Sequence, residues 1–189
     1  MRWFNRLLGV ASSEAPAEDR TLIHPLRRDA WAVRVSEDIA ESDVESWSAL
    51  FVHASSAMGK PRPSPRWLRQ AVPLVAAIGD LEALLVPWLA AADLAPHPTG
   101  WFERTPKRLH EDNRAVIKGL IWAAAPTGSP AFAESLAHFV ARCFAKYRGH
   151  GAACVSLGNA GLYALGQLPG ELAAVHLSVL RTRVRYPSA

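Results

Sequence analysis

The sequence predicts an all-α protein whose helices form a HEAT- or armadillo-like α-solenoid of about three to four antiparallel hairpins. Apolar residues recur at three- and four-residue spacing over several segments, which is the period of a helix with one buried face. Helix start and stop signals separate these segments. The pattern LVAAIGDL at residues 74–81 returns as GLYALGQL at 161–168. Half of that interval, roughly 43 residues, falls within the 40–47 residues of a HEAT or armadillo repeat. An irregular helical bundle with accidental periodicity is the alternative.

Composition and length fit one globular domain. The chain has 189 residues, of which 50% are apolar and 20% charged, and its net charge is +4. This modest positive charge allows contact with nucleic acid or acidic lipid without favouring either. No apolar run approaches the roughly 18–20 residues of a membrane span, so we expect a soluble protein without one. The two cysteines, Cys143 and Cys154, show no disulfide-framework density and fit a reducing cytoplasm, which is the location we predict.

Residues 1–20 are predicted to be an N-terminal arm and linker. The stretch MRWFNRLLGV has an apolar core shorter than the roughly 7–15 residues of a signal peptide, and SSEAPAEDR after it has linker composition. Residues 21–189 are predicted to form a single helical-repeat domain. The sequence leaves open whether residues 21–57 form a first repeat or a separate cap.

The first clear hairpin is predicted at about residues 64–92. Ser64 and Pro65 are a strong helix start, because a serine side chain can cap the first N–H groups and proline loses no needed bond at the first helical position. Gly79 and Asp80 end this helix, and LEALLVPWLAAADL follows at once.

A second hairpin is predicted at about residues 110–147. Asn113 is the expected cap of RAVIKGLIWAAA, which is apolar nearly all round. A helix of this kind must be covered on several sides, so we expect Trp122 to be buried between repeats. The segment PTGSP at 126–130 is a turn that leads into the next helix.

The third hairpin is predicted at about residues 156–185, with a turn at Gly166 to Gly170. Its second helix carries two apolar stripes, about 130° apart at 100° per residue. One stripe is Ala173, Leu177, Leu180 and Val184; the other is Leu172, Val175 and Val179. A terminal helix needs only one buried stripe, so the second is expected to bind a partner or another copy of the chain. The candidate partner-binding residues are Leu172, Val175, Val179, Arg181 and Arg185.

The segments NRAVIKGLIWAAA, AKYRG and SLGNAGLYALGQLPGELAAVHLSVLRTRVRYPSA resemble the helical repeat region of large bacterial proteins of the MolR/YehI-like group. These proteins carry a domain of unknown function, often beside a WGR domain, of which this chain shows no counterpart. The similarity is best over about residues 110–186. It implies an all-α HEAT-like fold, a short or truncated member, and no catalytic residues to carry over.

Direct evidence for chemistry is thin. His138, Cys143, His150 and Cys154 are suitable residue types for zinc, yet their spacing matches no common structural zinc pattern. The sequence has no nucleophile elbow, phosphate loop, HExxH or dinucleotide-binding fingerprint. We therefore predict no catalytic, cofactor-binding or metal-binding residues, and no cofactor.

Two functions follow as hypotheses. The first is a non-catalytic helical-repeat scaffold that binds a protein partner, or self-associates, through the C-terminal helix. The alternative is a nucleic-acid-binding module of the same architecture, in which arginines contact phosphates. The sequence identifies neither the partner, the oligomeric state nor the binding face.

Overall fold

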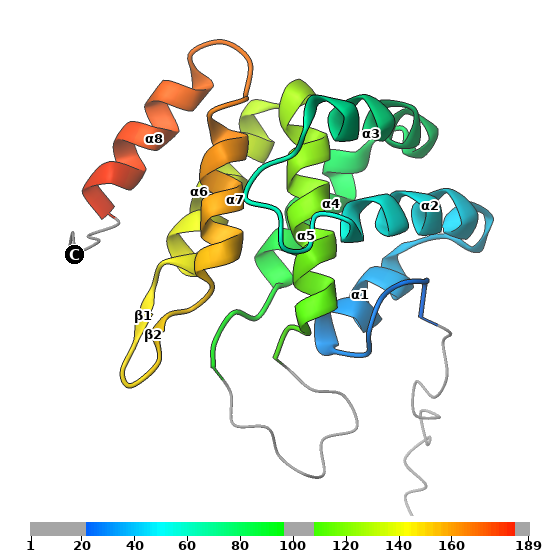
Figure 1. Cartoon of the computed structure of the whole chain (residues 1–189), viewed down its shortest axis with the longest axis horizontal. Coiled ribbons are helices and arrows are strands. Elements are labelled where there is room, and N and C mark those ends of the chain that lie inside the picture. The colour runs from blue at the N-terminus through cyan, green and yellow to red at the C-terminus, as the bar shows by residue number, and fades with distance from the viewer. Residues whose placement is uncertain (1–21, 97–107, 184–189) are drawn as a thin grey trace, which may run out of the picture.

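The computed structural model describes residues 22–96 and 108–183, and this part of the chain is mostly helical (Figure 1). The α-helices are α1 (Ala30–Asp38), α2 (Val44–Ser55), α3 (Pro65–Ile78), α4 (Leu81–Ala91), α5 (Glu111–Ala124), α6 (Pro130–Cys143), α7 (Val155–Leu165) and α8 (Leu172–Arg183). Two 3-10 turns, η2 (Glu41–Asp43) and η3 (Ala125–Thr127), lie between them. The predicted all-α class is confirmed. The predicted arm and linker at residues 1–20 lie outside the described residues.

The only strands within the described residues are β1 (Lys146–Tyr147) and β2 (Gly151–Ala152), which pair antiparallel between α6 and α7. The register places Lys146 opposite Ala152 and Tyr147 opposite Gly151. At the base of this hairpin, the Cys154 N–H donates to the Cys143 carbonyl at 2.9 Å. The hairpin therefore joins the end of α6 to the start of α7.

Most of the helices pack in two layers. One layer contains α2, α5 and α7, in which α5 contacts both of the others. The second contains α1, α4, α6 and α8, each of which contacts the next. In Figure 1, α5 and α7 stand side by side with α4 and α6 behind them. The remaining helix, α3, packs on α2 and α5.

Consecutive helices pair differently from the prediction. The predicted hairpins 64–92 and 110–147 would pair α3 with α4 and α5 with α6, but neither pair is in extensive contact. The axes of α3 and α4 diverge by 101°. The most extensive contact between consecutive described helices is instead that of α6 with α7. In the predicted hairpin 156–185, α8 contacts α7 and packs more extensively on α6.

This difference has a physical reason in where each apolar stripe is buried. The buried side of α3 contains Trp67 and Ala71 and is covered by α2 and α5. The buried side of α4 contains Leu85 and Trp88 and is covered by α1, α5 and α6. Since the two stripes need different partners, the chain turns sideways at Gly79, whose φ is 80°. Among consecutive helices, α6 then packs most extensively on α7, although the predicted hairpins place these two helices in separate units.

The helix starts show which capping predictions hold. Ser64 caps α3 as predicted, since its hydroxyl accepts from the Trp67 N–H at 3.1 Å. The prediction that Asn113 caps α5 is wrong, because that helix begins at Glu111 and His110 accepts from the Asp112 N–H. Asn113 is buried inside the first turn, where its amide bonds both backbone groups of Arg27.

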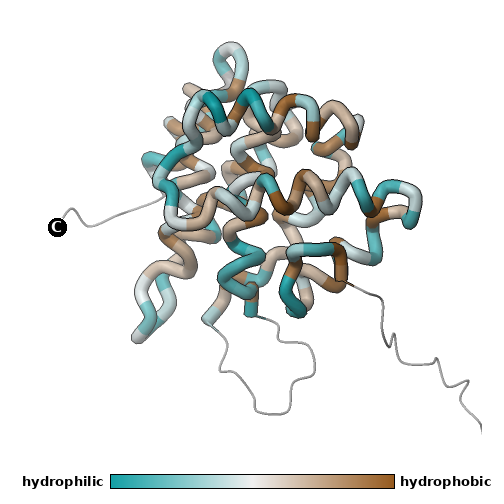
Figure 2. The backbone as a smooth tube through the Cα atoms, turned by 45° about the vertical axis from the view of Figure 1, so that its right-hand side comes forward, coloured by the Kyte–Doolittle hydropathy of each residue, from teal (hydrophilic) through white to brown (hydrophobic). Residues whose placement is uncertain are grey.

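Large aromatic side chains form two clusters in the core. In the first, the Trp88 ring lies 5.0 Å from Trp47 and 6.4 Å from Trp31, between ring centroids. The second contains Trp122, which is 1% exposed, as the sequence predicts. Its ring meets Trp67 of α3 and Tyr163 of α7 edge to face. Trp122 therefore joins three helices from different parts of the chain. Figure 2 shows apolar residues concentrated in the inner helical segments and hydrophilic ones on the outer turns.

Helices α2 and α5 approach each other closely at Gly119. A Cβ atom at this position would lie 2.4 Å from the Cα and carbonyl oxygen of Ala54. Both are backbone atoms, so the clash cannot be relieved by a side-chain rotation. Glycine is required here for packing, not for an unusual backbone conformation.

We expect Gly119→Ala to lower the free energy of unfolding by about 1–3 kcal/mol, the usual cost of overpacking a core. Urea denaturation followed by circular dichroism measures this change. Gly166→Ala is the matched control, because a Cβ there would lie at an ordinary contact distance of 3.4 Å from the Tyr163 carbonyl oxygen, and φ is −69°. Equal unfolding midpoints for the two variants would contradict a tight α2–α5 contact.

Candidate partner-binding groove

A groove of about 510 Å³ lies between α7 and α8, the C-terminal helix at the edge of the molecule in Figure 1. The residues that line it are Phe144, Val155, Asn159, Leu162, Leu177, Leu180 and Arg181. All except Asn159 and Arg181 are apolar. A concave apolar surface with a few polar groups at defined places is the usual form of a binding site for a helix or a small ligand.

The α7 side of the groove follows from helical spacing. Val155, Asn159 and Leu162 are four and three residues apart, so they share one face of α7. On the side towards α6, a Cβ at Gly158 would lie 2.7 Å from the Phe144 ring, and one at Gly161 would lie 2.3 Å from a Val140 methyl group. These two glycines let α7 lie close to α6. The close contact places Phe144 beside α7, where it joins the groove lining.

The α8 side of the groove contains the predicted inward stripe of this helix. Leu180 is 4% exposed, and Ala173 and Leu177 are half-buried against the core. Arg181 is exposed at the groove. Its guanidinium forms no hydrogen bond or ion pair with another residue of the described part of the chain, so its charge is available to a partner.

The predicted partner-binding residues do not all lie in this groove. Val175 is 58% exposed and Val179 is 41% exposed, and at 100° per residue they lie on the far side of α8 from Leu177 and Leu180. The expected outward apolar stripe is therefore present at these two positions. Leu172 begins α8, but its side chain lies outside the described residues, as does Arg185. Of the three candidates whose side chains are described, Val175, Val179 and Arg181, only Arg181 lines the groove.

Sequence reasoning missed the α7 contribution to this site. The sequence predicts a helix that ends in a turn at Gly166 to Gly170, but this pattern does not indicate which face of α7 the adjoining helix leaves open. The spacing of Val155, Asn159 and Leu162 is a signal that could have been used. The groove is open because α8 packs more on α6 than on α7. This preference depends on contacts between distant parts of the chain, and no local sequence pattern indicates it.

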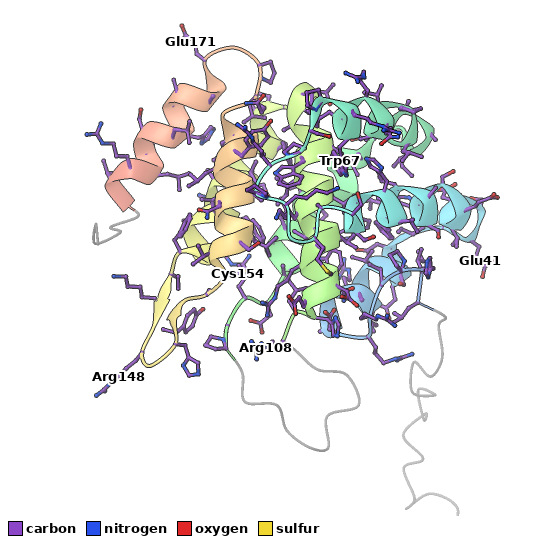
Figure 3. All side chains as sticks on the ribbon, viewed as in Figure 1. Glu41, Trp67, Arg108, Arg148, Cys154 and Glu171 are labelled. Carbon is purple, nitrogen blue, oxygen red and sulfur yellow. The ribbon has the colours of Figure 1, made fainter. Side chains whose placement is uncertain are left out.

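The zinc candidates are dispersed. His138 is exposed on α6, in the groove between α4 and α6, and His150 is exposed beside the β hairpin. Cys143 and Cys154 are buried at the base of that hairpin, and Figure 3 labels Cys154 there. Burial raises the pKa of the Cys143 thiol far above its usual range. Within the described residues, no three His, Cys, Asp or Glu side chains could together hold a metal ion.

A buried lysine, which sequence reasoning also missed, lies on α5. Lys118 is 6% exposed, and its ammonium donates to the Lys60 carbonyl and lies 5.0 Å from the centre of the Trp122 ring. Desolvation lowers the pKa of this ammonium. Among the described residues, no acceptor is available to the buried Trp122 Nε1–H. This region is therefore rich in donors and carries positive charge.

His53 and Trp67 form a stacked pair next to this lysine-containing region. Their ring centroids are 4.4 Å apart, and His53 Nε2 donates to the Trp67 carbonyl at 3.1 Å. Trp67 Nε1 donates to Ser56 Oγ at 2.7 Å. Desolvation lowers the pKa of His53, and the nearby Lys60 charge lowers it further. The imidazole is therefore held in its neutral form.

No protein-family model matches the chain, and no curated protein or solved structure is significantly similar to it. The resemblance to the MolR/YehI-like group stays a prediction. Among the described helices, none alone is long and apolar enough to cross a membrane, although α3 and α4, bent by 101°, reach the required length and composition together.

We expect stability to fall as the pH is lowered through the range in which His53 titrates. The unfolded histidine binds a proton near pH 6.5, and the folded one does so only at lower pH. The contribution of neutral His53 is therefore complete above pH 6.5 and is lost as the pH falls from 6.5 to the folded pKa. Urea midpoints between about pH 5 and about pH 8 measure this, with His53→Gln as the variant that lacks the titrating group. The same pH slope in both proteins would contradict it.

Proposed function

We propose that this protein is a non-catalytic helical-repeat scaffold that binds a protein partner at the α7–α8 groove. The observation that carries the proposal is an apolar groove between two helices, lined also by Arg181, whose guanidinium has no partner in the described part of the chain. The partner segment that suits this surface is an amphipathic helix whose apolar side chains fill the groove and whose carboxylate meets Arg181.

A HEAT-like arrangement is part of this proposal. The two layers support it, because helices of one layer contact each other and helices of the other layer do the same. The spacing supports it as well. In one layer α5 and α7 begin at Glu111 and Val155, and in the other α6 and α8 begin at Pro130 and Leu172. The starts within each of these two pairs are roughly 43 residues apart, within the range of such repeats.

Charge favours a different protein over a second copy of the chain. The helix most available for self-insertion is α8, whose outer face contains Val175 and Val179. The sequence of α8, LAAVHLSVLRTR, contains no acidic residue and carries two arginines. Inserting it into the groove of another copy would bring positive charge towards Arg181, which costs free energy in a partly desolvated contact. An acidic amphipathic helix avoids this repulsion.

A selection from a displayed library of helical peptides tests the proposal. We expect enriched peptides to carry apolar residues at three- and four-residue spacing with Asp or Glu beside them. Leu162→Asp should weaken these peptides at least tenfold, because burying a leucine contributes roughly 1.5–3 kcal/mol. Arg181→Glu should shift the selection from acidic to basic peptides.

Val72→Asp is the matched control, since Val72 is 66% exposed on α3 and does not line the groove. It should bind the selected peptides as the unmodified protein does. Circular dichroism confirms that each variant is folded. Selected peptides that bind Leu162→Asp and Val72→Asp equally well would show that the groove is not the site.

A further inference from the structure

Four cations gather in one short segment of the chain. Lys60, Arg62, Arg66 and Arg69 are all exposed in the stretch KPRPSPRWLR. No Asp or Glu occurs between Ala57 and Gly79, and within the described residues none of the four side chains takes part in an ion pair or hydrogen bond. Charges of one sign at this density repel each other, and the described part of the chain pairs none of them with an anion.

Contacts with the core hold the basic segment, residues 60–69, in place. Prolines at 61, 63 and 65 restrict its backbone, and Pro63 is buried. The Lys118 ammonium donates to the Lys60 carbonyl. Trp67, labelled in Figure 3, anchors the start of α3 through the Ser64 cap and the Ser56 hydroxyl. Because the loop is already ordered, a ligand would not have to supply the cost of fixing it.

The surroundings add to the positive potential. The buried Lys118 ammonium contacts the backbone carbonyl of Lys60. The N-terminus of α3, a helix that runs from Pro65 to Ile78, carries a partial positive charge at the same place. Arg66 lies in the first turn of α3 and Arg69 in the second. The exposed cations, the buried cation and the helix end therefore all attract the same kind of ligand.

A groove of about 480 Å³ adjoins this segment. Its lining residues are Arg62, Pro63, Ser64, Pro65, Leu68 and Tyr163. Tyr163 comes from α7, on the far side of the groove from the basic segment, and its ring is half-buried against Trp122. The surface therefore offers an aromatic ring held by the core beside a guanidinium.

We infer that this basic segment and its groove bind single-stranded nucleic acid. Phosphates would contact Lys60, Arg62, Arg66 and Arg69, and an unpaired base would enter the groove against Tyr163. Cations along a groove combined with an aromatic ring are the features by which proteins hold single strands. A duplex keeps its bases stacked inside, and a flat membrane surface would not reach a ring set within a groove.

Fluorescence anisotropy of a labelled oligothymidylate of about 12 nucleotides tests this inference. Replacing Arg62, Arg66 and Arg69 together by alanine should weaken binding at least tenfold. It should also reduce the slope of log K against log salt by roughly 2, because each phosphate contact on a single strand contributes about 0.7. Tyr163→Ala should weaken oligonucleotide binding roughly tenfold and leave heparin, a polyanion without bases, unaffected.

The control variant replaces Arg28, Lys146 and Arg148, which are exposed elsewhere, by alanine. It removes the same net charge, so it should retain the affinity and slope of the unmodified protein. Circular dichroism verifies folding of every variant. Equal losses in the two triple variants would mean that only net charge matters and would overturn the inference. The inference would also be overturned if the unmodified protein did not bind the oligonucleotide. It would be overturned as well if the triple arginine variant bound polyglutamate more weakly but bound the oligonucleotide as the unmodified protein does.

Discussion

Helix α5 is buried on almost every side, and the arrangement of the other helices follows from the need to cover it. Every residue from Asn113 to Ala124 except Arg114 is buried. A helix of this kind cannot lie at a surface. The chain surrounds it with α2, α3, α4 and α7, which come from both sides of α5 in the sequence. The layered packing, in which helices pair differently from the predicted hairpins, covers this central helix on almost all its sides.

Hydrogen bonds of buried and half-buried polar groups then fix the positions of the surrounding helices. The Asp29 carboxylate accepts from the N–H groups of Ala32 and His110 and from the Asn113 amide, each at 2.7 Å. It thereby ties the start of α1 to the start of α5. Arg142 of α6 donates to the Leu89 carbonyl at 3.0 Å and the Ala90 carbonyl at 2.9 Å, groups that end α4. Because an unpaired buried polar group costs about 1–3 kcal/mol, these contacts penalise any other helix register.

Local signals in the sequence were sufficient to predict the elements but not their partners. The Ser64 cap, the Gly79 turn and the burial of Trp122 could be predicted, since each depends on neighbours within a few residues or on an all-apolar helix. The cap of α5 could not. Asn113 is a good capping residue, but its amide is taken by Arg27 and Asp29, more than 80 positions earlier in the chain. Long-range hydrogen bonds of this kind leave no local pattern.

The same limit applies to the two candidate surfaces. Leu177 and Leu180 were predictable as an inward stripe, but the groove beside them exists because α8 rests mainly on α6 and leaves one face of α7 uncovered. The basic residues were visible in the sequence as isolated charges near helix ends. The association of Arg62 with Tyr163 depends on the packing of α7 against α5, which places residues about a hundred positions apart in one groove.

Lys118 shows how the core and the surface are joined. A lysine in the most buried helix is hard to explain by stability, because replacing a buried charge with an apolar side chain of similar volume is often neutral or stabilising. The ammonium is offset here by the Lys60 carbonyl and by the Trp122 ring. The contact with the Lys60 carbonyl is lost if the loop before α3 moves away. The residue therefore determines where that loop lies, and through it where Arg62 stands relative to Tyr163. In this respect a side chain of the central helix fixes the geometry of an exposed surface.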